Sequence, residues 1–334
     1  DTCAAASAAL ADPAPPTAAP QQLPVLRKDF LAILTLIYSH TTKLSVALNP
    51  ASPTPSAALS PLRELTSYAN TLASNAAAFH PPAHGAALTA EVRTLATNVL
   101  RALHDLSVTH LALYSASSSS KPSKGAAGEE YLVRTGVVHD LITRGQADLP
   151  KSNLVAVRRR WTDHGATLAD ALSELEDEPG DGADDGWDDP ELDFGFSAPR
   201  APEQTQLVEK IRNLVKRVAA LHTQIASVLL RPVAKQLHPP NPPPTPTNPL
   251  LDALLVTAPP LVAAVDELVS RIYDASDLSG ARDELLAALS GMAKAVAAFW
   301  PGMQDGEDGE GKEGSRRWFA AHFAGLEEGA KSID

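Results

Sequence analysis

The chain has 334 residues and a formal net charge of -12, from 40 acidic and 28 basic residues, with a single cysteine, Cys3. One cysteine excludes a disulfide framework within the chain and a cysteine-ligated zinc site, and it fits a reducing compartment. Its 57 alanines and 44 leucines are strong helix formers, whereas only 5% of the chain is aromatic. We therefore expect an all-α protein, and the length favours two domains.

The acidic excess is concentrated in one segment. Eleven carboxylates and no basic residue lie between Glu174 and Asp193, and the rest of the chain has 29 acidic and 28 basic residues. The net charge therefore describes this segment rather than the folded surfaces.

Prolines and apolar periodicity divide the first half of the chain into helical segments. Residues 1–23 are rich in Ala and Pro and lack the plan of a signal peptide, so we expect a disordered leader there. The following segments predict five helices, at residues 24–48, at 60–79 after Ser60 and Pro61, at 89–113 with Thr89 as cap, at 129–144, and at 152–175 with Ser152 as cap.

Further helices are predicted after the acidic segment. Pro202 begins the sixth helix, whose apolar residues alternate steps of four and three, as in a coiled coil: Leu207, Ile211, Leu214, Val218, Leu221, Ile225 and Val228. We expect this seam to pack within its own bundle, and pairing with another chain is the alternative. The seventh helix, residues 250–273, is predicted to break at Pro259 and Pro260. The last two helices are expected near residues 285–299 and 318–326.

This order of helices predicts two antiparallel helical bundles joined by an acidic linker. The expected parts are the leader at 1–23, a five-helix bundle at 24–178, the acidic linker at 179–201, and a C-terminal bundle at 202–330 with Pro-rich and Gly/Asp-rich loops. No uninterrupted apolar run of 18 residues occurs, so we expect no membrane span.

The sequence carries no motif of a catalytic or metal site. A zinc-protease motif, a nucleophile elbow and a phosphate loop are all absent. A calcium-loop frame that begins at Asp181 has Leu192 in place of its closing glutamate. His80 and His84 are separated by prolines, and His110 lies in an apolar stripe, which is typical of a core residue. We therefore expect no enzyme, metal or cofactor.

Aromatic side chains interleave with the carboxylates of the acidic segment. The candidate partner-binding residues are Trp187, Leu192, Phe194 and Phe196 together with Asp184, Asp185, Asp188 and Asp189. A plain spacer does not need apolar anchors, so we interpret the segment as a binding element, and a flexible tether is the alternative. The three arginines Arg158–Arg160 fan around a predicted helix beside these acids, so we expect no direct DNA binding.

Three short motifs follow one another along the chain. They are Thr-Thr-Lys-Leu-Ser at Thr41–Ser45, Arg-Thr-Gly-Val-Val at Arg134–Val138, and Leu-Pro-Lys-Ser-Asn at Leu149–Asn153. In this order, and with the acidic insertion and heptad-like helix after them, they resemble the cyclin-D-interacting protein family, also called GCIP or cyclin-D-binding protein.

The resemblance implies a non-enzymatic, two-domain helical protein of nucleus and cytoplasm. Such a protein binds cyclin D or helix-loop-helix regulators and restrains cell-cycle progression. Two other functions stay open. The acidic-aromatic segment suggests an escort or chaperone for a basic client protein, and the helical architecture suggests a scaffold bundle of the vinculin or catenin kind.

Overall fold

The computed structural model describes residues 2–11, 20–117, 129–176, 202–231, 247–274, 278–300 and 310–333. Every regular element within these ranges is an α-helix, which confirms the all-α prediction. The helices form two compact units, Asp1–Ala156 and Val157–Asp334. The expected linker at 179–201 lies outside the described residues, so two bundles joined by that linker stay a prediction.

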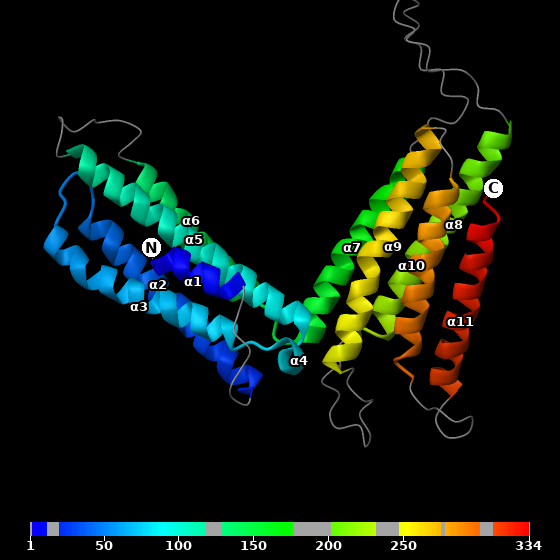
Figure 1. Ribbon diagram of the computed structural model, residues 1–334, viewed down its shortest axis with the longest axis horizontal. Helices are drawn as coiled ribbons and strands as arrows, with labels where there is room; N and C mark the ends of the chain where they lie inside the picture. The colour runs from blue at the N-terminus through cyan, green and yellow to red at the C-terminus, as the bar shows by residue number, and fades with distance from the viewer. Residues whose placement is uncertain are drawn as a thin grey trace, which may run out of the picture. The chain divides into compact units, whose positions relative to one another are not determined.

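Long helices pack in a ring in the first unit (Figure 1). They are α2 (Leu23–Ala47), α3 (Pro55–Ala77), α5 (Ala86–Ser117) and α6 (Glu130–Asp148). Helix α2 packs on α3 and α6, and α5 packs on the same two helices, so α2 and α5 are diagonal in the ring. Phe30 and Phe79 meet edge to face in the core, with ring centroids 6.1 Å apart, and both are fully buried.

Two helices of the first unit begin earlier than predicted. Helix α3 begins at Pro55 rather than after Ser60, because the fixed φ of proline suits a first turn, and Pro61 lies inside the helix. The short α4 (Pro81–His84) precedes α5. Helix α5 contains Thr89 in its first turn, where the Thr89 hydroxyl donates to the Gly85 carbonyl at 2.7 Å instead of capping the helix.

Helix α1 (Thr2–Ala11) corrects the expectation of disorder for this part of residues 1–23. It packs on α3 and α5, with Ala6 and Leu10 buried. Its alanines favour helix strongly but form no apolar stripe, so the periodicity of the sequence did not indicate it. Residues 12–19 lie outside the described residues, and the prediction for them stays open.

The second unit contains α7 (Asn153–Glu176) from Val157 onward, α8 (Pro202–Val228), α9 (Asn248–Asp274), α10 (Ser279–Ala297) and α11 (Glu310–Lys331). Helix α10 packs on α9 and α11, and α11 packs on α8. The fully buried Trp161 of α7 donates from Nε1 to the His222 carbonyl of α8 at 3.0 Å. Most of α7, which was expected in the bundle at 24–178, therefore packs with the second unit.

Helix α9 runs through Pro259 and Pro260, where the sequence predicted a break. Both prolines are exposed, and the neighbouring Ala258 and Leu261 are fully buried. Packing of this apolar face on α10 stabilises the helix across the missing N–H groups. In α8, the five central seam residues are buried within the unit, as expected for packing in its own bundle: Ile211, Leu214, Val218, Leu221 and Ile225.

Two helices meet a length and composition criterion for a membrane span. They are Leu23–Ala47 and Asn248–Ile272. The expectation of no membrane span stays a prediction. This is weak evidence for a span, because core helices of helical proteins pass the same test. In this structure both helices bury one face against neighbouring helices.

Candidate functional site

The residues predicted to bind a partner lie outside the described residues. They are Trp187, Leu192, Phe194, Phe196, Asp184, Asp185, Asp188 and Asp189. The structure describes the acidic segment only as far as Glu176, whose carboxylate pairs with Lys216 of α8 at 3.0 Å. Partner binding by the acidic segment therefore stays a prediction.

The histidines near the start of α5 make structural contacts. His84 is buried, and its Nδ1 accepts a hydrogen bond from the His80 backbone N–H at 2.9 Å. Its Nε2 donates to the Gln21 carbonyl at 2.8 Å, so both ring nitrogens are occupied. His110 is buried against the Tyr131 ring, as predicted for a core residue, and burial lowers its pKa. Among the described residues, no group of three His, Cys, Asp or Glu side chains could hold a metal ion.

Two of the three family-like motifs meet between α2 and α6. The Ser45 Oγ and the Thr135 Oγ1 are 2.6 Å apart, and both side chains are buried. Because the Thr135 hydroxyl donates to the Tyr131 carbonyl at 2.7 Å, the Ser45 hydroxyl is the donor of this pair. Buried hydroxyls are costly without partners, so the pair fixes the register of α2 against α6.

The outer side of the same helix contact is a surface that we call the α2–α6 face. It consists of Thr35, Tyr38, Thr42 and Val46 of α2 and of Leu132, Gly136, His139 and Gln146 of α6. The His139 ring stacks on the Tyr38 ring with centroids 3.9 Å apart. The His139 Nε2 lies 3.2 Å from the Thr42 hydroxyl, and the Gln146 Nε2 donates to the Thr35 hydroxyl at 2.8 Å.

One end of the α2–α6 face is apolar and exposed. Val46 is 71% exposed and Leu132 is 55% exposed, although both are aliphatic. A Cβ added at Gly136 would meet nothing within 4 Å. Glycine inside a helix costs about 1 kcal/mol relative to alanine, and no neighbour in the described structure requires its small size. Burial lowers the pKa of His139, so its ring is neutral at neutral pH. Such a face suits docking of a protein partner.

The third motif, Leu149–Asn153, forms the connection between α6 and α7. The Arg27 guanidinium donates to the Leu149 carbonyl from Nη2 at 3.1 Å and to the Pro150 carbonyl from Nε at 3.4 Å. The Ser152 hydroxyl accepts from the Val155 N–H at 3.4 Å, as predicted for a cap of this helix.

The side chain of Asn153, the last residue of that motif, links this connection to the start of α5. Its side-chain Oδ1 accepts a hydrogen bond from the Leu88 N–H at 3.1 Å. The same side chain fills the space beside Gly85, where a Cβ would overlap it, and Gly85 has a φ of 91°. Glycine is therefore required at position 85 both by the backbone and by the neighbouring side chain.

The sequence did not indicate the α2–α6 face. Periodicity identifies residues that point into the core, whereas Tyr38, Val46, Leu132 and His139 lie on the other sides of their helices. One feature of the sequence could have indicated it: Gly136 lies in the middle of a predicted helix, where glycine is unfavourable unless it has another role.

Comparison with known families gives a match to the N-terminal domain described as Grap2 and cyclin-D-interacting, over residues 29–180. No curated protein matches the chain. The matched range contains all three motifs, the Ser45–Thr135 pair and the whole α2–α6 face. Residues 29–180 therefore match the Grap2 and cyclin-D-interacting family, as the motifs indicated.

Proposed function

We propose that the chain is a non-enzymatic regulator that binds cyclin D or helix-loop-helix regulators and so restrains cell-cycle progression. The match to a cyclin-D-interacting domain over residues 29–180 supports binding of a cyclin-D-like protein. The proposal places the protein in nucleus and cytoplasm and includes neither direct DNA binding nor membrane insertion.

We assign the docking of this partner to the α2–α6 face. The observation that carries the assignment is the convergence of two family motifs, 90 residues apart, at the Ser45–Thr135 hydrogen bond. The buried part of each motif sets the register of the helices, and Val46 and Leu132, which lie just outside the two motifs, are exposed to solvent. A pair of helices held in fixed register loses little freedom when a partner binds, which favours affinity.

Two valines of equal exposure make a matched test. Val46 on the face and Val256 of α9 in the second unit are each 71% exposed. Val46→Asp should weaken the binding of purified cyclin D by about tenfold or more, because a carboxylate would be desolvated against the partner. Val256→Asp should leave the affinity within about twofold of the unmodified chain. Titration calorimetry measures both.

The possible results test the identity of the partner and the location of the docking surface separately. If the unmodified chain does not bind cyclin D at micromolar concentration, cyclin D is not the partner, and the same variants are tested with a helix-loop-helix regulator. If binding occurs and the two valine variants lose equal affinity, the assignment to the α2–α6 face is wrong.

A further inference from the structure

The connection between α2 and α3 carries two hydroxyl side chains that are each followed by a proline (Figure 1). They are Ser52, before Pro53, and Thr54, before Pro55. Every residue from 51 to 57 is exposed, so both hydroxyl residues and both prolines are accessible to solvent. The connection therefore presents two Ser/Thr–Pro pairs to any enzyme that acts on such pairs.

The backbone of this connection has no regular secondary structure and is held by few hydrogen bonds. The Ser52 N–H donates to the Asn49 carbonyl at 3.0 Å, and the Thr54 N–H donates to the Ala47 carbonyl at 2.7 Å. Thr54 is the N-cap residue of α3, with φ of -119° and ψ of 79°, and its side chain makes no capping hydrogen bond. An exposed segment of this kind opens locally at a small cost in free energy, so it can adopt the extended form that an enzyme cleft binds.

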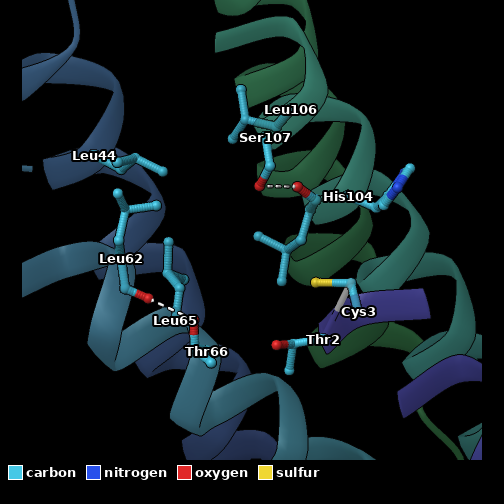
Figure 2. Close-up of a pocket in the computed structure, with 10 residues that line it drawn as sticks. Thr2, Cys3, Leu44, Leu62, Leu65, Thr66, His104, Leu106 and Ser107 are labelled. Atoms are coloured by element: carbon cyan, nitrogen blue, oxygen red, sulfur yellow. Dashed lines mark hydrogen bonds between the residues drawn. The ribbon is translucent and has the colours of Figure 1, made fainter. Parts of the chain in front are cut away.

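A third pair, Ser60 and Pro61, lies inside α3 and is held differently. Ser60 is exposed on a continuous helix, whereas Pro61 is buried. Directly after this pair, Leu62 lines a pocket, and its carbonyl accepts a hydrogen bond from the Thr66 hydroxyl at 2.9 Å (Figure 2). An enzyme would reach Pro61 only by unwinding this packed part of α3. The pair that begins at Thr245 lies outside the described residues.

We propose that Ser52 and Thr54 are phosphorylated by a proline-directed Ser/Thr kinase. Proline after the acceptor is selected by a cleft that has no hydrogen-bond acceptor for an N–H at that position, because proline has no N–H to leave unsatisfied. Among the described residues, only the α2–α3 connection presents an exposed proline directly after an exposed hydroxyl residue. The inference does not rest on the proposed function, because phosphate on the chain is measured without a binding partner.

The reaction changes the charge of this surface. The acceptor hydroxyl oxygen attacks the γ-phosphorus of ATP, the bond from this phosphorus to the bridging β,γ-oxygen breaks, ADP leaves, and the hydroxyl proton passes to the kinase. Each phosphate adds a charge of about -1.5 to -2 at neutral pH. Residues 48–62 contain no charged side chain, and the first turn of α3 contains no acidic one. Phosphorylation therefore makes a neutral surface anionic, and a phosphate on Thr54 gives α3 an anionic cap.

The test incubates the full chain with ATP, Mg²⁺ and a purified mitogen-activated protein kinase, which is proline-directed. Mass spectrometry of the intact chain counts the phosphates, and fragment masses assign them to residues. Pro53→Ala should slow phosphorylation of Ser52 by about tenfold or more, because the new N–H has no partner in the cleft, and should leave the rate at Thr54 within about twofold. Pro55→Ala should have the reverse effect. Circular dichroism checks that both variants are folded.

Two serines of the same region serve as controls. Ser56 is exposed but is followed by Ala57, and Ser60 lies before the buried Pro61. Neither should be phosphorylated in the full chain. In a synthetic peptide of residues 48–64, Ser60 should become a substrate, because so short a peptide forms little helix and has no core in which to bury the proline.

The assignment of each acceptor stands or falls on these measurements. Absence of phosphate at Ser52 or at Thr54 would overturn the proposal for that residue. Phosphorylation of Ser56 or Ser60 in the full chain at the rate of Ser52 would overturn the selection by exposed proline. Rates that neither Pro53→Ala nor Pro55→Ala changes would do the same.

Discussion

Lowering the pH from 7.5 to 5.0 should destabilise the second unit by about 2 kcal/mol through one histidine, His222 of α8. Its side chain is 4% exposed, and its ring stacks on Trp161 with centroids 4.5 Å apart. The His222 Nε2 has no hydrogen-bond partner among the described residues. Burial lowers the pKa of His222 to about 4, and the nearby His164 lowers it further in the same direction.

The direction of this pH effect follows from the protonation of His222 in the folded and unfolded states. The unfolded chain protonates His222 near its ordinary pKa of 6.5, whereas the folded unit resists protonation until the pH reaches about 4. Stability is therefore fully present above pH 6.5 and is lost as the pH falls toward 4. At pH 5.0 this linkage costs about 2 kcal/mol. For a unit of this size, such a loss lowers Tm by about 4–8 °C.

Urea unfolding at the two pH values measures the effect. Tryptophan fluorescence reports on the second unit, because the sequence of the first unit, Asp1–Ala156, contains no tryptophan. His222→Phe keeps an aromatic ring against Trp161 but does not titrate, so it should lose about 2 kcal/mol less than the unmodified chain between the two pH values.

His322→Phe is the matched control for this change. Its ring also stacks on a tryptophan, Trp318, with centroids 4.5 Å apart, but its Nε2 bonds to the Arg217 carbonyl at 3.1 Å near the surface. This variant should keep the pH dependence of the unmodified chain. If His222→Phe keeps it as well, the assignment of the pH effect to His222 is wrong.

Three further predictions concern the first unit, each measured by urea unfolding with circular dichroism. Gly85→Ala should lower the free energy of unfolding by at least about 2 kcal/mol, because the φ of 91° and the Asn153 side chain both oppose a Cβ. Adding Asn153→Gly to the same chain should restore part of this loss. If the losses of the two substitutions simply add, the steric explanation is wrong. Ser45→Ala should lower the free energy of unfolding by about 1 kcal/mol, and Thr135→Val should lower it further, because it leaves the Ser45 hydroxyl buried without its partner. A larger loss in Ser45→Ala than in Thr135→Val would contradict the assignment of Ser45 as donor and Thr135 as acceptor. Leu10→Ala should cost about 2–3 kcal/mol, since Leu10 is the large buried side chain of α1. The same variant should speed modification of the partly buried Cys3 thiol by a soluble aryl disulfide, and an unchanged rate would show that Leu10 does not hold α1 in place.

The fold class and most helices could be predicted because each long helix buries a regular apolar stripe. The failures have local physical causes. Helix α1 is built from alanines, which favour helix without marking a face. The helix start expected at Ser60 and Pro61 and the break expected at Pro259 and Pro260 rest on single residues, whereas packing acts on whole helices and keeps α3 and α9 continuous.

The surfaces of the first unit could not be predicted, because they depend on which helices become neighbours. Ser45 and Thr135 each look like an ordinary helix residue until the fold brings them within 2.6 Å. The family resemblance identified the right segments without locating a face, because short motifs mix residues that set helix register with residues that remain exposed.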